Sequence, residues 1–330
     1  MSEIKPSMNN TQVIGILDEM NLEETTKEVT LRGANGVEKK VQCRHIAKKE
    51  FRNPMFTVDV NGMTVGVDFF PVSEKKLDDN GNIVDNPRFA SMETVMNKYV
   101  TKLQAAKDGS TPTRVKIDGN LAENLYIDGN TFEPKSIQQV QGFQITSSNV
   151  PEDDIADCEI TGVIGKIIPE TKGSDGEETG RLKVTLYTFN RNAEVIPFNF
   201  IVEQDLVDDF TSFYEVGQSV KLYYEIITKQ VGQQKQTTGG FGRRDSHRVS
   251  GFSVTEYSVF RGSEPFDEEN EYFVDIDTVK QALNERGIKI ENMVKAKKEE
   301  GTKPKTSSPK GASGIAKANP FGSSTKKSPF

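Results

Sequence analysis

Histidine and cysteine are scarce in this sequence, which has 330 residues but only two of each. Acid–base catalysis by histidine and metal sites built from several histidines are therefore nearly excluded. Cys43 and His45 form a possible pair of metal ligands, but no second pair follows at zinc spacing, so a chance pair is the better interpretation. Cys158 lies far along the chain from Cys43, which argues against a disulfide framework and indicates a reducing, cytoplasmic setting.

Long apolar segments and phosphate-binding motifs are also missing. No run approaches the roughly 20 apolar residues that span a bilayer, and residues 1–10 contain no apolar core of a secretory signal, so we expect neither a membrane partner nor export. No glycine-rich phosphate loop or dinucleotide-binding motif occurs, and the carboxylates are scattered through turns and acidic runs. We therefore predict no enzyme activity, no catalytic residues, no cofactor and no metal.

Charge is distributed unevenly along the chain. The formal net charge is −7, yet residues 295–330 hold nine Lys against two Glu, while residues 264–277 hold seven acidic side chains and no basic one. The last segment has almost no large apolar residues, so burial cannot offset the entropy lost on ordering it. We predict a disordered basic tail over 295–330, preceded over 264–294 by an acidic segment and a short helix that ends before Gly287.

The first half of the chain is predicted to consist mostly of strands and tight turns. Asn61-Gly62 lies between two alternating segments, which is a strong hairpin signal because both turn residues accept positive φ. One helix is expected to begin at Ser91 and to run to about Ala106, because apolar residues recur there at helical spacing.

The second half predicts three strands over 159–168, 181–189 and 194–202, then a helical segment, then two strands that begin near Gly217 and Val249. Three strands, a helix and two strands is the order of an OB-fold, a five-stranded Greek-key barrel. Gly142-Phe143 and Gly251-Phe252 stand 109 residues apart and suggest a repeat of the same plan. The predicted fold is mainly β: two OB-fold-like Greek-key barrels in tandem, over 1–150 and 151–263, with a disordered C-terminal tail.

Three basic and aromatic clusters favour binding of a nucleic-acid strand, because cations neutralise phosphates and aromatic rings stack on bases. The first is the loop over 228–248, between the last two strands of the second barrel. It has a single acid, Asp245. Its predicted DNA-binding residues are Lys229, Lys235, Phe241, Arg243, Arg244 and Arg248. The alternative is a mobile, solvated hairpin tip.

The second cluster lies on the predicted strand over 181–189. Alternation places Lys183, Tyr187 and Phe189 on the face opposite the apolar core residues, and Tyr223 is a weaker candidate of the same kind. The alternative is that Tyr187 and Phe189 pack against the first barrel or a helix.

The third cluster has six cations and one aromatic ring against a single acid, Glu50. It comprises Lys39, Lys40, Arg44, Lys48, Lys49, Phe51 and Arg52. The alternative is a charged hairpin face that only contacts solvent.

The end of the chain, Pro329-Phe330, resembles the tip of bacterial single-stranded-DNA-binding proteins, in which a disordered linker closes with Pro-Phe and recruits replication and repair proteins. Lys326-Lys327 stand where that family has acids. The acidic residues 264–277 could supply that charge and fold over the groove when DNA is absent.

As a whole, the chain is similar to replication-type single-stranded-DNA-binding proteins of bacteriophages, in which OB domains precede a flexible tail. The resemblance implies that the chain binds and protects single-stranded DNA without strong sequence preference during replication, recombination or repair. It also implies the host cytoplasm as location and recruitment of partner proteins through Pro329 and Phe330. Two alternatives remain: a β-rich interaction or virion-associated scaffold, and an RNA-binding OB protein.

Overall fold

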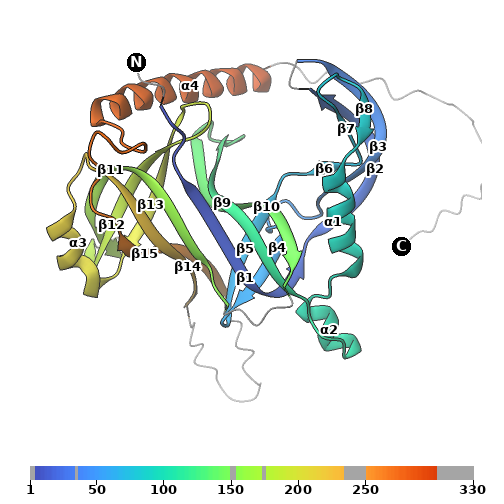
Figure 1. The fold of residues 1–330 in the computed structure, drawn as a ribbon, viewed down its shortest axis with the longest axis horizontal. Coiled ribbons are helices and arrows are strands. Elements are labelled where there is room, and N and C mark those ends of the chain that lie inside the picture. Colours follow the sequence, from blue (N-terminus) through green and yellow to red (C-terminus); the bar gives the residue numbers. More distant parts are fainter. Residues whose placement is uncertain (1–3, 34–35, 149–153, 173–175, 234–249, 303–330) are drawn as a thin grey trace, which may run out of the picture.

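The structure, a computed structural model, describes residues 4–33, 36–148, 154–172, 176–233 and 250–302. Its strands form two neighbouring barrels that are joined into one continuous ten-stranded sheet (Figure 1). The predicted mainly β fold with two barrels in tandem is confirmed. The predicted disordered tail lies outside the described residues from 303 onward.

The first barrel closes through five strand pairs. Its strands in spatial order are β1 (Asn9–Met20), β4 (Phe56–Val60), β5 (Met63–Phe69), β10 (Pro134–Ser147) and β9 (Arg114–Ile127), and β9 returns to pair with β1. The β5–β10 pair is parallel and the other four pairs are antiparallel. This is the strand order of an OB-fold. The Asn61-Gly62 turn between β4 and β5 is confirmed, with φ of 52° and 85°.

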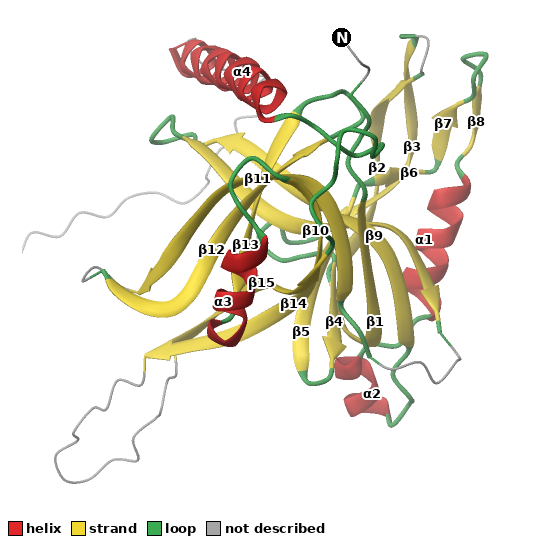
Figure 2. Ribbon diagram, turned by 60° about the vertical axis from the view of Figure 1, so that its left-hand side comes forward, coloured by secondary structure: helices red, strands yellow, loops and turns green. Residues whose placement is uncertain are grey.

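Two insertions enlarge the first barrel. A long hairpin of β2 (Leu22–Arg32) and β3 (Glu38–Lys48) separates β1 from β4. Three short strands follow β5: β6 (Val72–Ser73) pairs with β3, while β7 (Lys75–Leu77) and β8 (Ile83–Asp85) pair with each other. Figure 2 shows these strands standing beside the barrel, next to α1.

The helix predicted over 91–106 is instead two helices. α1 (Pro87–Lys98) begins earlier, because the Asn86 side chain accepts a hydrogen bond from the Arg88 amide. α2 (Lys102–Asp108) begins anew at Thr101, whose side chain accepts from the Gln104 amide in a capping box. Ser91, predicted as the cap, lies inside α1.

The second barrel repeats the plan more simply. Its strands in spatial order are β11 (Asp157–Lys172), β12 (Glu177–Phe189), β13 (Val195–Val202), β15 (Ser250–Gly262) and β14 (Ser219–Gln233), and β14 returns to β11. The β13–β15 pair is parallel, as β5–β10 is. The 3₁₀ turn η1 (Gln204–Leu206) and α3 (Val207–Phe213) stand between the third and fourth strands, where the sequence predicts a helix.

The two barrels are joined by strand pairing and by an exchange of contacts. β1 pairs antiparallel with β11, with Asn10 opposite Glu159. From the first barrel, Gln138 on β10 exchanges two hydrogen bonds with the backbone of Asn199 on β13. From the second barrel, Thr228 on β14 donates to the carbonyl of Thr64 on β5. The β9–β10 hairpin of the first barrel therefore contacts β13, the third strand of the second barrel. The β14–β15 hairpin of the second barrel in turn contacts β5, the third strand of the first.

A long helix, α4 (Ile276–Thr302), covers one end of the second barrel (Figure 1). It continues past Gly287, so the prediction of a helix ending there is wrong, and the first eight residues of the predicted tail are helical. Val279 is fully buried, in a cluster with Val163 and Phe189. The first turns of α4 therefore pack on the second barrel. None of the helices in the described ranges is long and apolar enough to cross a membrane.

Candidate nucleic-acid interface

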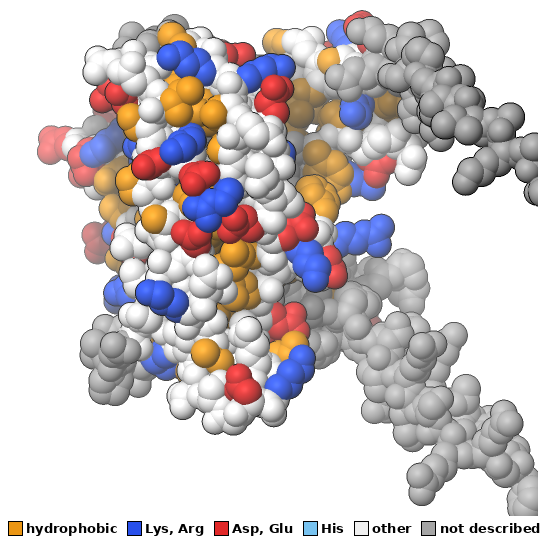
Figure 3. Space-filling view, turned by 90° about the vertical axis from the view of Figure 1, so that its right-hand side faces the viewer, with side chains coloured by type: hydrophobic (Ala, Val, Ile, Leu, Met, Phe, Trp, Pro, Cys, Tyr) orange, Lys and Arg blue, Asp and Glu red, His pale blue; other side chains and the backbone are white. Residues whose placement is uncertain are grey.

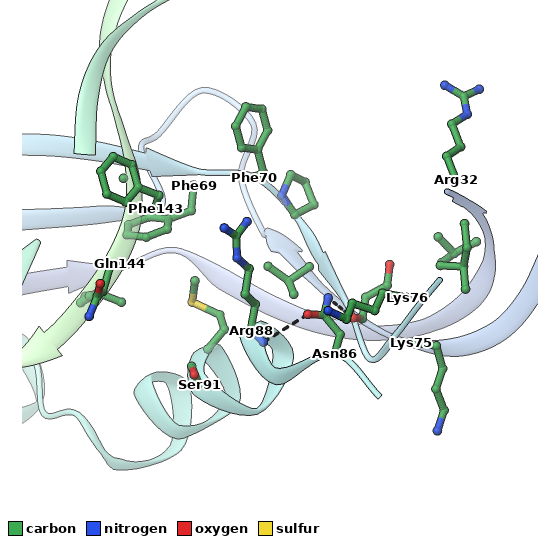
Figure 4. Close-up of a pocket in the computed structure, with 18 of the residues that line it drawn as sticks. Arg32, Phe69, Phe70, Lys75, Lys76, Asn86, Arg88, Ser91, Phe143 and Gln144 are labelled. Carbon is green, nitrogen blue, oxygen red and sulfur yellow. Dashed lines mark hydrogen bonds between the residues drawn. The ribbon is translucent and has the colours of Figure 1, made fainter. Parts of the chain in front are cut away.

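A groove of about 800 Å³ lies in the first barrel between the β2–β3 hairpin, the β5–β8 segment, the first turns of α1 and strand β10. Figure 4 shows its side chains. We call it the hairpin groove. Among the residues that the structure describes, it is lined by four cations, Arg32, Lys75, Lys76 and Arg88, and by no acidic residue. Such a lining suits a polyanion, because phosphates meet positive charge without opposing carboxylates.

Two of these cations make no ion pair within the part of the chain that the structure describes. They are Arg88, near the start of α1, and Lys76, on β7, and both are exposed. In Figure 4 the Arg88 side chain extends from α1 toward the rings of Phe70 and Phe143. Lys75 pairs with Asp85 at 2.5 Å, and Arg32 pairs with Glu38 at 2.9 Å, both at the surface. Exposed pairs of this kind are weak and leave the cation able to exchange partners.

Two exposed phenylalanines stand beside these cations. Phe70 is 72% exposed and Phe143 is 56% exposed. Phe69 points the other way, into the core, where its ring lies 5.3 Å from that of Phe56 in an edge-to-face arrangement. Because neighbouring strand residues face opposite sides, the burial of Phe69 leaves Phe70 in the groove. Exposed rings beside cations are what single-strand binding requires.

The predicted cluster over 39–52 is only partly available for phosphates. Arg44 is held by Glu24, Glu74 and Glu93 at 3.5, 3.1 and 2.5 Å, and hydrogen bonding to Glu74 and then to Glu93 raises its pKa. Lys48 is half-buried against Asp68 at 2.7 Å.

The hairpin itself carries charges of both signs. Lys39 and Lys40 lie exposed on β3, and Lys40 is 3.3 Å from Glu28. On the side of the molecule that holds the hairpin, Figure 3 shows basic and acidic side chains interspersed. This part of the cluster therefore matches the alternative of a charged hairpin face more closely.

The loop that follows β3 remains a candidate. Lys49, Phe51 and Arg52 are all exposed there, and Phe51 is 87% exposed. The Asn21 side chain fixes the loop, since it donates to the carbonyls of residues 50, 53 and 54 and accepts from the amide of Glu50. The structure thus brings these three predicted residues together on a defined loop.

The three residues predicted to form a binding face on β12 differ in exposure. Lys183 is exposed, and Tyr187 is half-buried with its ring against Gly165, where an added Cβ would lie 2.0 Å from the ring. Phe189 is only 3% exposed and packs in the cluster beneath α4. Its assignment as a base-stacking residue is not supported, because no face of the ring is open to a base. The alternative of packing against a helix describes it.

The remaining predicted residues of the second barrel are engaged or outside the described ranges. Tyr223 is held between two cations, with Lys221 5.4 Å and Arg261 4.1 Å from its ring centre. Lys229 bonds Glu256 at 2.7 Å in a network with Arg181, and its assignment as a phosphate-binding residue stays a prediction. Burial acts to raise the pKa of Glu256, but hydrogen bonds from Arg181 and Lys229 hold it below its usual range. Lys235, Phe241, Arg243, Arg244, Arg248, Pro329 and Phe330 lie outside the described residues.

The acidic residues 264–277 contact the second barrel at both Phe266 and Val274, and they also contact the segment before β1. Ser219 donates to the carbonyl of Val274 at 2.8 Å, and Glu271 forms an ion pair with Lys5. The hypothesis that residues 264–277 fold over the DNA-binding groove when DNA is absent therefore stays a prediction.

The residues that line the hairpin groove were not among the predicted binding residues. Phe143 gave a signal, as part of the Gly142-Phe143 repeat. The alternation of β5, continued one residue past its end at Phe69, would have placed Phe70 outside the core. Nothing local marks Lys76 or Arg88, since the hairpin, β7 and α1 bring them together only in the fold. Within the described ranges, no three His, Cys, Asp or Glu side chains are grouped to hold a metal ion.

Comparisons with known proteins add a family and two distant structural likenesses. The wild-type single-stranded DNA binding protein from Thermus aquaticus has a TM-score of 0.35 and 11% identity, covering 81% of this chain and 97% of that one. A deletion mutant of the same protein has a TM-score of 0.38 and 11% identity, covering 80% and 98%. Likeness of this degree establishes neither a shared function nor a shared binding site. No curated protein matches this sequence.

The family model described as YorF matches residues 7–298, which is most of the sequence. The chain therefore belongs to the YorF family.

Proposed function

We propose that this chain is a non-enzymatic protein that binds single-stranded DNA without strong sequence preference. The observation that carries the proposal is the hairpin groove, in a chain built from two OB-type barrels. Its described lining has four cations, two exposed phenylalanines and no acid. Cations that track a backbone and rings that accept any base give sequence-tolerant binding. We infer replication or recombination as its setting, with partners recruited through Pro329-Phe330.

Phosphate binding by the groove has a defined consequence for salt dependence. Each phosphate contact on a single strand contributes about 0.7 to the slope of log affinity against log salt. Arg88 is the cation to change, because it is exposed, makes no ion pair with another described residue and extends toward both rings. Arg88→Gln should weaken binding and reduce the slope by about 0.7. Phe70→Ala should weaken binding and leave the slope unchanged.

The experiment is fluorescence anisotropy of a labelled oligo-dT titrated with the full chain at several salt concentrations. Arg191→Gln is the matched control, since Arg191 is an exposed arginine on the β12–β13 turn, outside the groove. Duplex DNA and oligo-U run as competitors. Tight, salt-sensitive binding that prefers dT supports the proposal, whereas preference for oligo-U indicates RNA. If the chain fails to bind even at low salt, the proposal is wrong and the scaffold alternative takes its place.

A further inference from the structure

Phe143 and Phe260 occupy the same unusual position in the two barrels. Along β9 and β10, Gly119 pairs with Gly142 but Asp118 pairs with Gln144, so Phe143 is the additional residue of a β-bulge. Along β14 and β15, Tyr224 pairs with Val259 but Tyr223 pairs with Arg261, so Phe260 is likewise additional. A bulge re-aims a side chain that regular alternation would direct elsewhere.

The equivalence also holds relative to the third strand of each barrel. Phe143 follows Gly142, the last β10 residue paired with β5, and Phe260 follows Val259, the last β15 residue paired with β13. Phe143 and Phe260 are therefore the structurally equivalent residues of the two barrels. The sequence repeat of Gly142-Phe143 with Gly251-Phe252 does not correspond to it, because Gly251 lies seven residues before Ser258, where pairing with β13 begins. Both bulge rings are solvent-accessible, with Phe143 56% and Phe260 44% exposed.

Both rings line one groove of about 560 Å³ at the junction of the barrels, which we call the junction groove. Its floor is formed by β1 and β11, which run antiparallel there. Each barrel supplies equivalent parts: residues of its first strand, one or two residues of its fourth strand beside the bulge, and the bulge phenylalanine. The antiparallel pairing of two equivalent strands places the two rings in related positions on the groove.

The junction groove adjoins a groove on each barrel, because neighbouring grooves share lining residues. Phe143 lines both the hairpin groove and the junction groove. Phe260 and Arg261 line both the junction groove and a smaller groove of about 280 Å³ beside α3, where Phe213 is 65% exposed. Each bulge phenylalanine therefore lies on the border between two neighbouring grooves.

The charges of the junction groove differ from those of the hairpin groove. Asp118, Asp157 and Glu159 line it, and Glu159 bonds Lys221 at 3.0 Å. Arg261 is stacked on Tyr223, 4.1 Å from the ring centre. Carboxylates along the floor repel phosphates, so a strand that crosses this groove must turn its phosphates outward and its bases inward, toward the rings.

We propose that single-stranded DNA crosses from the first barrel to the second through the junction groove, with bases stacked on Phe143 and Phe260. The inference rests on the proposed function and specifies its path. The two grooves then contribute differently to the binding free energy. The hairpin groove binds phosphates, so its contribution depends on salt. The junction groove stacks bases, so its contribution depends little on salt. A stacked base contributes about 1–3 kcal/mol, so losing one ring should weaken binding by roughly 5- to 150-fold.

The test uses the full chain and an oligo-dT of about 30 nucleotides, long enough for two OB-type barrels at roughly 4–16 nucleotides each. Phe143→Ala, Phe260→Ala and the double variant are compared with Tyr126→Ala, which removes an exposed ring of β9 outside this groove. Circular dichroism and thermal unfolding confirm that each variant folds. We expect weaker binding for each bulge variant, greater weakening for the double variant, an unchanged salt slope, and no effect of Tyr126→Ala.

Photocrosslinking gives a second readout that does not depend on affinity. An oligonucleotide that carries 5-iododeoxyuridine should crosslink to peptides containing Phe143 and Phe260. If the unaltered chain binds DNA but the double variant binds equally well, or if the crosslinks fall only elsewhere, this inference is wrong while the proposed function stands. If the unaltered chain does not bind DNA, the proposed function fails, and the inference with it.

Discussion

Gly142→Ala should destabilise the first barrel by forcing Phe69 out of its position. A Cβ built on Gly142 would lie 2.4 and 2.5 Å from two carbons of the Phe69 ring, a separation that real Cβ atoms do not show. Phe69 is only 8% exposed and packs edge-to-face on the buried Phe56, so the ring cannot move freely. Overpacking of this kind costs about 1–3 kcal/mol. At about 2–4 °C per kcal/mol, typical of somewhat smaller domains, the melting temperature should fall by roughly 2–12 °C.

The assay is urea and thermal unfolding followed by circular dichroism, for Gly142→Ala, Phe69→Leu and the double variant. Leucine lacks the ring carbons that meet the new methyl group, so the double variant should lose less stability than the two single losses added together. Additive losses, or a Gly142→Ala variant as stable as the parent chain, would refute this account of the bulge. Because Phe143 follows directly, the same variant should also bind oligo-dT more weakly.

Three further outcomes follow from other parts of the structure. Gly287→Ala should raise the free energy of unfolding by about 0.5–1 kcal/mol, since Gly287 lies inside α4 and its Cβ would meet no described atom within 4 Å. A loss of stability would mean that the helix ends there. Burial raises the pKa of Cys158 to about 12, so this thiol should resist alkylation at pH 8 in the folded chain and react readily in urea; fast labelling of the native state would contradict this. Burial, then Lys27, lowers the pKa of His45, so its contribution to stability should be complete above about pH 6.5 and decline as the pH falls toward its folded-state value; the His45→Gln variant should lack this part of the pH profile.

Local patterns in the sequence were sufficient for most of the barrel. Alternation along β12 placed Leu182, Val184 and Leu186 in the core, where the structure has them. Asn61-Gly62 fixed the β4–β5 turn through positive φ. These features depend on residues a few positions apart, which is why the sequence alone reveals them.

The candidate interface depended on contacts that no local pattern contains. Arg44 resembles a free cation in the sequence, but Glu74 and Glu93 reach it from other elements. Phe189 fits the exposed face of β12 by alternation, yet α4 covers it from far along the chain. A bulge shifts the alternation by one residue at a single place, so Phe260 reads as an ordinary strand residue until its pairing is known.

The exchange of contacts between the barrels constrains how the chain folds during synthesis. Gln138 binds a strand made some sixty positions later, and Thr64 accepts a hydrogen bond from Thr228, which is translated far behind it. The first barrel therefore leaves the ribosome without the hairpin that rests on its third strand. Contacts so distant in sequence slow folding, because a long loop must close before they form. We expect the nascent first half to stay incomplete, and to need protection from aggregation, until β15 has emerged.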